Sequence, residues 1–418
     1  MAVNGGGVMS RRIAVIGGGA AGMAAAIRAA QCGAHVTVYE RNDRIGKKIL
    51  STGNGKCNFS NEKMSAAYYY GSGSRLIEPV YGRIGVREVR ELFEGLGMRI
   101  KDKNGYLYPA SEQASTVLDV LRYEMERLKV EVHTGQLVTD LKVHKGMLSV
   151  ETADRSKSVY DAVILACGGR AAPKTGSDGL GFKLADKMGH RIVPTVPALT
   201  ALRCEGDFWK RVAGVRCEAG LTLKADGKKV CAERGELQWT DYGISGIPVF
   251  QMSRHAAYGL EAHKAVTVEI NLMPDDREDR DGYEAFWIKR WAKQDGQTME
   301  QFVTGLVNKK IGLMLLKQAQ IKESEKVRNV SAAYRKRLSE LFCSFTVTVK
   351  GTNPFEQAQV CAGGVDCSEV TEDLASVIVP GLFFAGEILD VDGMCGGYNL
   401  QWAWSSGMTA GQAAAGQS

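Results

Sequence analysis

The sequence lacks the features that would assign it to a metal-dependent or disulfide-rich class. None of its ten cysteines forms a CxxC pair, and no group of histidines and cysteines has the spacing of a metal site. We therefore predict no metal centre. Scattered thiols without a disulfide framework are typical of a reducing compartment, so a cytoplasmic protein is expected. Internal repeats and low-complexity tracts are also missing, which argues against a solenoid or a largely disordered chain.

Long hydrophobic runs are missing as well. The longest apolar-looking stretch near the N-terminus, residues 13–30, is interrupted by glycines, polar residues and Arg28, so it is typical of a strand, turn and helix. Arg11 and Arg12 are not followed by an uninterrupted apolar segment with a small-residue cleavage site, so no signal peptide is predicted. The chain of 418 residues is expected to form two or three globular domains without a membrane partner.

Charge is nearly balanced, but it is unevenly placed. The net charge is +6, and residues 283–350 hold 13 Lys and Arg against 6 Asp and Glu, a local excess of +7. An acidic stretch at 275–281 partly offsets this excess. Two interpretations stay open: a solvated helical face, which charge alone favours, or a surface for an anionic partner such as nucleic acid.

The first forty residues have the order of a dinucleotide-binding unit. Gly17-Gly18-Gly19-Ala20-Ala21-Gly22 matches GxGxxG and lies between a β-branched run at 12–16 and an alanine-rich helix predicted over 20–32. A second strand is predicted over 35–39 and ends at Glu40. A glycine motif in this context predicts a Rossmann-type βαβ unit.

Each residue of this motif has a physical role. Gly17 permits the tight turn, Gly19 lets the backbone approach a pyrophosphate, and Gly22 allows close packing of helix against strand. The helix N-terminus stabilises the negative charge of the phosphates. Glu40 is expected to accept hydrogen bonds from the adenosine ribose hydroxyls.

The residues after Glu40 favour FAD over NAD. Segment 41–58 reads RNDRIGKKILSTGNGKCN, and an NAD enzyme needs nothing there. In FAD enzymes of the glutathione-reductase type the chain returns across the cofactor at this point. Three glycines (46, 53 and 55) allow that approach, and Lys47 and Lys48 are expected to neutralise phosphate charge. An ordinary basic surface loop is the alternative.

A second glycine motif lies near the other end of the chain. Segment 381–387 predicts a strand ending in Gly386-Glu387, a pair suited to hydrogen-bonding a ribityl chain. Segment 392–399 reads DGMCGGYN and precedes an amphipathic helix predicted over 399–415. Backbone N–H groups at the start of that helix are expected to face the flavin pyrimidine edge. Two such motifs in one chain are a stronger indication of FAD than either alone.

The middle of the chain predicts two insertions. We expect an N-terminal part of the FAD-binding domain over 1–192, with helices at 85–98 and 113–128, and a small inserted β domain over 193–274. A helical insert is expected over 275–342, and the C-terminal part of the FAD-binding domain over 343–418.

These motifs resemble the BaiN-like family of bacterial flavoproteins, which is distantly similar to the fumarate-reductase flavoprotein group. The resemblance covers nearly the whole chain, and it is carried by GGGAAG (17–22), GKKILSTGNGKCNFSN (46–61), TGSDGLGFKLADKMGH (175–190), GISG (243–246) and GLFFAGEILDVDGMCGGYNLQWAWSSG (381–407). Two departures stand out. Members commonly carry a Thr-like residue where Cys395 stands, and Trp239-Thr240-Asp241-Tyr242 replaces a Phe-Thr-His-Tyr-like run, so no histidine role carries over there.

The resemblance implies an α/β fold: a Rossmann-type FAD-binding domain built from both ends of the chain, with an inserted β-barrel-like domain and a helical domain. It also implies reduction of a carbon–carbon double bond conjugated to a carbonyl. The motifs and the resemblance together give these predicted FAD contacts: Gly17, Gly19, Ala20, Ala21, Gly22, Glu40, Arg41, Lys47, Lys48, Gly53, Asn58, Val138, Gly168, Gly386, Glu387, Asp392, Gly396, Gly397, Tyr398 and Asn399. No His or Cys tether is evident, so the FAD is expected to be non-covalent.

Two residues are candidates for catalysis. Cys395 is expected near the flavin, as a proton donor or as a packing residue. Tyr242 lies in a glycine-flanked turn of the inserted domain and is a candidate to polarise a carbonyl, or simply an amphipathic residue at a domain surface. No second GxGxxG follows a strand, so NADH or NADPH is expected to dock only transiently as the electron donor.

Three functions remain open. The first is reduction of a small-molecule enone, with unsaturated 3-oxo bile-acid intermediates of 7α-dehydroxylation as the favoured substrate. The second is dihydrouridine synthesis in ribosomal RNA, which predicts a continuous basic surface and a flipped-out base. That surface would be formed by residues such as Lys289, Arg290, Lys309, Lys310, Arg335, Lys336 and Arg337. The third is a flavin-bound redox sensor. The oligomeric state is left open.

Overall fold

The computed structural model describes residues 10–274 and 280–417, so most of the predicted acidic stretch at 275–281 lies outside the described residues. The chain divides into two compact units. The Rossmann unit comprises the described residues up to Val196 together with those from Gln359 onward, and the barrel unit comprises Pro197–Ala358. The Rossmann unit is therefore built from both ends of the chain, as the resemblance implied.

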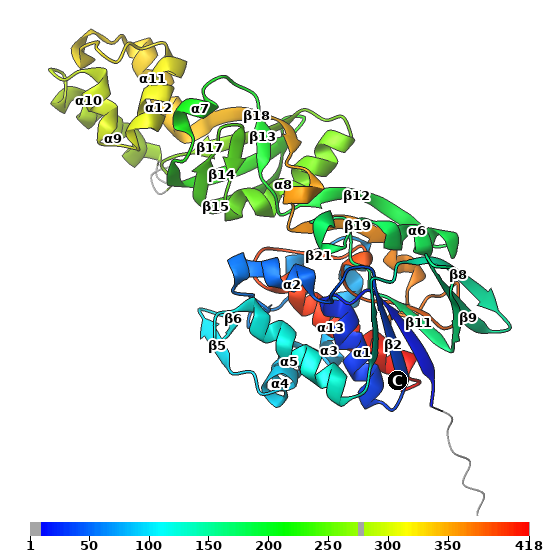
Figure 1. Ribbon diagram of the computed structural model, residues 1–418. Helices are drawn as coiled ribbons and strands as arrows, with labels where there is room; N and C mark the ends of the chain where they lie inside the picture. Colours follow the sequence, from blue (N-terminus) through cyan, green and yellow to red (C-terminus); the bar gives the residue numbers. More distant parts are fainter. Residues whose placement is uncertain (1–9, 275–279, 418) are drawn as a thin grey trace, which may run out of the picture. The chain divides into compact units, whose positions relative to one another are not determined.

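The Rossmann unit is organised around a five-stranded parallel sheet (Figure 1). Its strand order is β20-β11-β1-β2-β7. The bounds are β1 Arg12–Ile16, β2 His35–Glu40, β7 Glu131–Thr134, β11 Ala162–Leu165 and β20 Leu382–Phe384. β1 and β11 are buried, apolar runs of the kind that suits the centre of a parallel sheet covered on both faces.

The first and last helices of the described chain pack side by side on this unit, as the blue and red ribbons of Figure 1 show. α1 spans Ala20–Gln31 and α13 spans Tyr398–Ala414. The approach is so close that a Cβ at Gly407 would lie 2.4 Å from the Ala21 carbonyl oxygen, and one at Gly411 would lie 2.3 Å from the Ala25 carbonyl oxygen. Only glycine fits at these two positions.

Further elements complete the Rossmann unit. They comprise α2 Lys47–Ser51, β3 Ser60–Asn61, β4 Tyr69–Tyr70, α3 Ile77–Arg83, α4 Val86–Gly95, β5 Ile100–Lys103, β6 Tyr106–Pro109, α5 Ala114–Arg127, the antiparallel strands β8 Val138–His144, β9 Met147–Thr152 and β10 Lys157–Tyr160, α6 Leu180–Lys187, the pair β12 Ile192–Ala198 and β19 Val360–Val365, and β21 Asp392–Gly393. α4 and α5 confirm the helices predicted at 85–98 and 113–128.

The barrel unit holds a closed six-stranded barrel of order β13-β16-β15-β14-β17-β18. Its strands are β13 Leu202–Cys204, β14 Arg216–Ala225, β15 Lys228–Trp239, β16 Gly243–Ser245, β17 Val266–Asn271 and β18 Phe345–Thr352. An aromatic cluster fills its interior, where Trp239 lies 5.8 Å from Trp209 and 6.2 Å from Phe345 between ring centroids. The structure confirms the barrel-like domain that the resemblance implied.

Among the described residues of this unit, six α-helices accompany the barrel: α7 Trp209–Val212, α8 Ile247–Glu261, α9 Arg280–Lys293, α10 Met299–Thr304, α11 Lys309–Ala319 and α12 Ala332–Ser344. The helices from α9 to α12 and the barrel share one hydrophobic core. The sequence analysis predicted 343–418 as the C-terminal part of the FAD-binding domain, and this segment includes β18. In the structure β18 belongs with the barrel, because it pairs with both β13 and β17.

One long helix in the predicted β domain escaped the sequence analysis. α8 spans Ile247–Glu261, begins with Pro248 in its first turn, and buries Val249, Met252 and Ala256 completely. The spacing of these three residues is helical, but short strand-like runs on both sides obscured it. Among the described helices of the chain, we find none with the length and apolar character needed to span a bilayer.

Two histidines with a lowered pKa should make folding sensitive to acid. Burial lowers the pKa of His255 on α8 to about 4, and it also lowers the pKa of His190 although the nearby Glu369 acts in the opposite direction. Because an unfolded histidine titrates near 6.5, the unfolded chain gains protons that the folded chain does not as pH falls below about 6.5. Stability should therefore be fully present above this pH and decline toward pH 4.

Urea unfolding at pH 7.5, 6.0 and 5.0 measures this effect. We expect the free energy of unfolding to fall less between pH 7.5 and 5.0 in His255→Asn than in the wild-type chain. The same change at the exposed His35 serves as the control. Equal pH dependence in the His255 variant and the wild type would contradict the assignment.

Candidate functional site

The predicted cofactor residues of the two glycine motifs meet at one edge of the parallel sheet. Gly17 follows β1, Glu40 ends β2, Gly168 follows β11, and Gly386 with Glu387 follows β20. The carboxyl ends of these parallel strands share an edge, where ligands of open α/β sheets bind. Segments more than 340 residues apart in sequence are thereby brought together.

The glycine turn after β1 has the geometry that its motif predicts. Gly17 has a φ of +108°, and a Cβ there would lie 2.5 Å from the Ala166 carbonyl oxygen. A Cβ at Gly22 would lie 1.9 Å from the Gly17 carbonyl oxygen, so the helix can approach the strand only through glycine. A Cβ at Gly19 would meet no atom within 4 Å. Gly19 therefore borders open space directly before the start of α1.

Glu40 is buried and held in place by backbone and side-chain donors. One carboxylate oxygen accepts from the Gly18 N–H at 2.9 Å, and the other accepts from the backbone and side-chain N–H groups of Asn42 at 2.8 and 2.7 Å. The Asn42 amide also donates to the Thr175 carbonyl at 3.0 Å. These three bonds orient the carboxylate and leave one lone pair, on the oxygen bound to Gly18, to accept a ribose hydroxyl.

Three basic residues of the following loop have acidic partners. Arg41 pairs with Asp178, and Lys47 pairs with Asp43 at 2.6 Å. The Lys48 ammonium lies 2.8 Å from a carboxylate oxygen of Glu387, the acid of the second motif. The structure thus connects the two predicted motifs directly through this last pair.

Glu387 receives further bonds at the end of β20. Its other oxygen accepts from the Cys361 N–H at 2.8 Å, and the Gly169 N–H reaches the Lys48-bound oxygen at 3.4 Å. Gly168, next to it, has a φ of +70° and lies against Ser177. The acid therefore sits where three segments of the chain converge.

The turn before α13 is closed by its own side chains. Asn399 accepts from the Gly393 N–H at 2.8 Å and donates to the Gly393 carbonyl at 2.8 Å. Gly396 and Gly397 have φ of +124° and +92°, so both require glycine. Asp392 is buried on β21, which pairs with β4. Asn399 therefore fixes the turn through its side chain.

Tyrosines hold the same turn from the other side. The Tyr69 hydroxyl donates to the Tyr398 carbonyl at 2.9 Å, and the Tyr81 hydroxyl donates to Tyr69 at 2.6 Å. The ring of Tyr398 packs against Tyr68 with centroids 5.0 Å apart, and burial raises its pKa to about 12. These contacts make the start of α13 rigid.

The residues present fit an elongated dinucleotide such as FAD. The N-cap residues of α1 and α13 are Gly19 and Gly397, and neither helix start is capped by a side chain, so their first N–H groups are left for a ligand. The side-chain carbonyl oxygen of Asn58 is buried without a hydrogen-bond partner among the described residues. It lies 3.0 Å from where a Cβ at Gly397 would be, beside the second helix start.

The remaining candidates occupy different surroundings. Gly53 adopts left-handed backbone in a turn next to Asn58, and Val138 is a buried residue at the start of β8. Burial raises the pKa of the Cys395 thiol to about 12, so this group is protonated at neutral pH. Its sulfur lies 3.8 Å from the side-chain carbonyl oxygen of Gln359. Cys395 thus belongs to the same turn as Gly396 and Gly397.

Tyr242 lies in the barrel unit, in the turn between β15 and β16. Its carbonyl accepts from the Cys204 N–H at 2.9 Å. Its hydroxyl accepts from the side-chain amide of Asn353 at 2.9 Å. Tyr242 belongs to the barrel unit and the sheet-edge residues belong to the Rossmann unit, so they form two distinct sets of candidates.

The sequence analysis missed the residues that hold the loop after Asn58 against the C-terminal part of the chain. Ser60 donates to Gln401 at 2.6 Å, Asn61 donates to the Gly396 carbonyl at 2.9 Å, and the Trp404 indole donates to the Phe59 carbonyl at 2.9 Å. These bonds join the loop after Asn58 to α13 and to the turn that precedes it. The only sequence signal was that these polar residues lie within the two family-like motifs.

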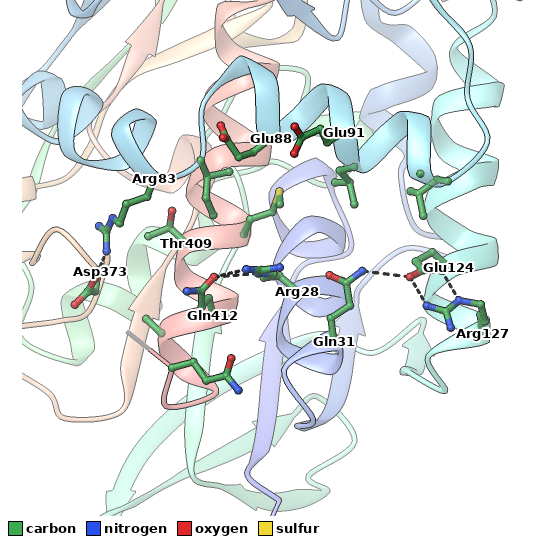
Figure 2. A pocket seen from close by; sticks show the side chains of 17 residues that line it. Arg28, Gln31, Arg83, Glu88, Glu91, Glu124, Arg127, Asp373, Thr409 and Gln412 are labelled. Carbon is green, nitrogen blue, oxygen red and sulfur yellow. Dashed lines mark hydrogen bonds and ion pairs between the residues drawn. The ribbon is translucent and has the colours of Figure 1, made fainter.

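A surface cavity of about 910 Å³ lies elsewhere on the Rossmann unit. Its lining comes mainly from α1, α3, α4, α5 and α13. Figure 2 shows that Arg28 points to Gln412, Arg83 to Asp373, and Gln31 and Arg127 to Glu124. Arg28 lies about 12 Å along α1 from its first residue, at 1.5 Å per residue. None of the predicted cofactor contacts lines this cavity, so it is separate from the sheet-edge site.

The fold and the sheet-edge site define a flavin-dependent oxidoreductase of the Rossmann class. More particularly, the chain belongs to the family described as HI0933-like protein Rossmann domain, whose model matches residues 11–413. This membership confirms the resemblance noted in the sequence.

Individual relatives are similar over nearly the full chain. The sequence is 43% identical over 413 residues to the 3-dehydro-bile acid Δ(4,6)-reductase of Clostridium scindens, covering 97% of this chain and 99% of that protein. It is 29% identical over 405 residues to the ribosomal RNA dihydrouridine synthase of Haemophilus influenzae, covering 94% and 95%. Among solved structures, a 3-ketosteroid-Δ4-(5α)-dehydrogenase from Rhodococcus jostii RHA1 is 16% identical with a TM-score of 0.48, covering 98% of each chain.

Substitutions at two glycines of the first motif should distinguish an effect on folding from an effect on cofactor binding. In Gly22→Ala the new Cβ meets the Gly17 carbonyl, so we expect the free energy of unfolding to drop by about 1–3 kcal/mol or more. In Gly19→Ala the Cβ projects into open space, so the apoprotein should unfold at the wild-type urea concentration. FAD affinity should nevertheless fall by at least about tenfold, or about 1.4 kcal/mol. Urea denaturation and absorbance titration with FAD measure the two effects, and wild-type FAD affinity in Gly19→Ala would place the pyrophosphate elsewhere.

Proposed function

We propose that this protein is an FAD-dependent reductase of a carbon–carbon double bond conjugated to a ketone, acting on unsaturated 3-oxo bile-acid intermediates in 7α-dehydroxylation. The observation that carries the proposal is the 43% identity, over nearly the whole of both chains, to a reductase of 3-dehydro-bile acids. NADH or NADPH is proposed as the electron donor, bound transiently because no second glycine motif follows a strand. Ten free thiols are consistent with a reducing, cytoplasmic location.

The chain's own residues have distinct tasks in this proposal. Bound FAD supplies hydride chemistry, which the protein itself lacks. Glu40 would hold the adenosine ribose, the N–H groups at Gly19 the pyrophosphate, and Glu387 the ribityl chain, with Lys48 balancing the charge of Glu387. The uncapped start of α13 would place its positive end toward the flavin pyrimidine edge.

Two residues are proposed to act on the substrate. The Tyr242 hydroxyl would donate to the ketone oxygen, where negative charge develops as the β-carbon is reduced. The Cys395 thiol is protonated at neutral pH because burial raises its pKa to about 12, so it can hold a proton but cannot act as a base there. A packing role for Cys395 fits the same surroundings.

Ribosomal RNA reduction is the second candidate, on the strength of the relative at 29% identity and the basic helices. The contacts of those helices weaken it. Arg290 lies over the Phe302 ring and donates to the Phe302 carbonyl, and Arg335 lies over the Trp291 ring and donates to the Val330 carbonyl at 2.8 Å. Lys309 pairs with Glu300 at 2.5 Å. Lys336 also pairs with Glu340 at 3.9 Å, so four of the seven predicted RNA-binding side chains are engaged within the helical region.

Anaerobic oxidation of NADH and NADPH by the FAD-loaded protein tests the proposal. With an unsaturated 3-oxo bile acid as acceptor, we expect turnover and a product two mass units heavier, because two hydrogens are added. Unmodified ribosomal RNA is the parallel acceptor. Dihydrouridine formation without bile-acid turnover would establish the second candidate instead, and flavin reduction without turnover of either acceptor would support a redox sensor.

A further inference from the structure

The surface cavity of the Rossmann unit is lined by a buried hydroxyl group that has no partner. Thr409 of α13 is 4% exposed, and its side-chain oxygen makes no hydrogen bond among the described residues. A threonine within a helix can bond to the carbonyl four residues earlier, but this one does not. Buried polar atoms without partners are uncommon in folded proteins, and an absent ligand, ion or water is a usual reason for them.

A positive charge without a counter-charge lies beside this hydroxyl. The guanidinium of Arg28 on α1 donates to Gln412 Oε1 on α13, at 3.0 Å from Nε and at 2.6 Å from one Nη atom (Figure 2). Gln412 follows Thr409 by three residues, so both lie on the same side of the helix. The acceptor of Arg28 is therefore a neutral amide, and no carboxylate in the described part of the chain pairs with this arginine.

The acidic side chains of the lining, in contrast, all have arginine partners. The pairs are Glu124 with Arg127 at 2.7 Å, Asp373 with Arg83, Glu88 with Arg87 at 2.6 Å, and Glu91 with Arg87 at 3.8 Å. Glu88 and Glu91 share one arginine, which leaves one negative charge over. The Glu91 side chain is 66% exposed, so water and salt screen that charge.

The backbone carbonyls at the ends of α1 and α13 are also in use. Six of them accept hydrogen bonds from N–H groups of the residues that follow each helix. They are the carbonyls of Arg28, Ala29 and Ala30 on α1, and of Gly411, Gln412 and Ala413 on α13. Such closing bonds satisfy the acceptors that a helix end would otherwise offer. A cationic ligand would therefore find few acceptors at these two helix ends.

The polar groups that remain are donors. The second Nη atom of Arg28 and the side-chain nitrogen of Gln412 make no hydrogen bond to any described residue, and the Thr409 hydroxyl can also donate. Because Arg28 occupies the oxygen of the Gln412 amide, this amide can offer a ligand only its N–H groups. Three donors around one positive charge suit an anion, and charge-assisted hydrogen bonds of this kind are the strong ones.

Apolar side chains form much of the remaining wall. Ile84, Leu92, Leu96 and Met408 line the cavity, together with Ala413. Its volume of about 910 Å³ falls within the range of about 300–1,000 Å³ that is typical of small-molecule sites. A ligand that satisfied both parts of the lining would combine an anionic group with an apolar body.

We propose that this cavity binds an amphipathic carboxylate, with its carboxylate on Arg28, Gln412 and Thr409 and its apolar body against Leu92 and Leu96. The site goes beyond the proposed function, because none of the predicted cofactor contacts lines it. All of its residues belong to the Rossmann unit. A fatty acid, with a flexible chain, and a bile acid, with a rigid ring system, both present this chemistry.

Calorimetric titration of the FAD-loaded protein tests the chemical class. The probes are octanoate, octanol and octylammonium, which share one apolar chain and differ in the polar group. We expect octanoate to bind, and the other two to bind about tenfold more weakly or worse, because they lose the charge-assisted hydrogen bonds. Octanol or octylammonium binding as tightly as octanoate would overturn the proposal.

Cholate is titrated in parallel to distinguish the two sources of the carboxylate. Tighter binding of octanoate would indicate a fatty acid, and tighter binding of cholate would indicate a bile acid. All titrations stay below the concentration at which the probe forms micelles. Failure of both carboxylates to bind would overturn the proposal, whether or not the protein reduces an enone.

Arg28→Gln tests the cation. We expect the affinity for the carboxylate that binds the wild type to fall by about tenfold or more. Arg122→Gln is the matched control, because Arg122 is an exposed arginine of α5 that pairs with Asp119 and does not line the cavity. The control should keep the wild-type affinity. Unchanged carboxylate binding in Arg28→Gln would place the ligand elsewhere and overturn the proposal.

Thr409→Val separates binding from stability. Valine has nearly the same shape and removes the hydroxyl, so a buried polar group without a partner is lost from the apoprotein. We expect the thermal midpoint of the ligand-free holoenzyme to stay the same or rise. The carboxylate affinity should nevertheless fall by about three- to tenfold, the contribution of one hydrogen bond. A lower midpoint with unchanged affinity would show that Thr409 is structural and contradict its place in the site.

Discussion

The close contact between α1 and α13 is the constraint on which the Rossmann unit depends. Gly407 and Gly411 allow the last helix to lie directly against the backbone of the first, at the carbonyls of Ala21 and Ala25. Gly386, after β20, also packs on Ala21, and its N–H is bound by Ser406 of α13 at 2.9 Å. A side chain at either glycine of α13 would move the second motif away from the first, and the sheet-edge site would not assemble.

The same contact sets the electrostatics of the site. Residues 21, 25 and 28 of α1 meet residues 407, 411 and 412 of α13, so the two helices run in the same direction and their dipoles are aligned. α13 begins nine residues before Gly407, so its start extends past that of α1 by roughly 12 Å. Two uncapped positive helix ends therefore occupy different points along one edge, an arrangement suited to an elongated anion.

Local patterns predicted much of this architecture from the sequence. The GxGxxG turn, Glu40 and the Gly386-Glu387 pair each follow a short apolar strand, and parallel strands necessarily gather their carboxyl ends. The sequence could not reveal that Lys48 binds Glu387 or that Asn399 closes its own turn, because these bonds depend on the tertiary fold. α8 was overlooked although Val249, Met252 and Ala256 have helical spacing. The sequence analysis placed β18 in the FAD-binding domain and not with the barrel, because the partners of a strand cannot be read from local sequence.

The position of the barrel unit within the chain has a consequence for biosynthesis. Pro197–Ala358 is one continuous segment, whereas the Rossmann unit needs β1 near its beginning and β20 with α13 near its end. During translation the barrel segment is made before β20 and emerges from the ribosome ahead of it. A nascent chain can therefore complete the barrel while β1, β2 and β11 still lack an edge strand and a covering helix. Flavin binding is then a late event. The chain would need a chaperone most while this incomplete sheet is exposed.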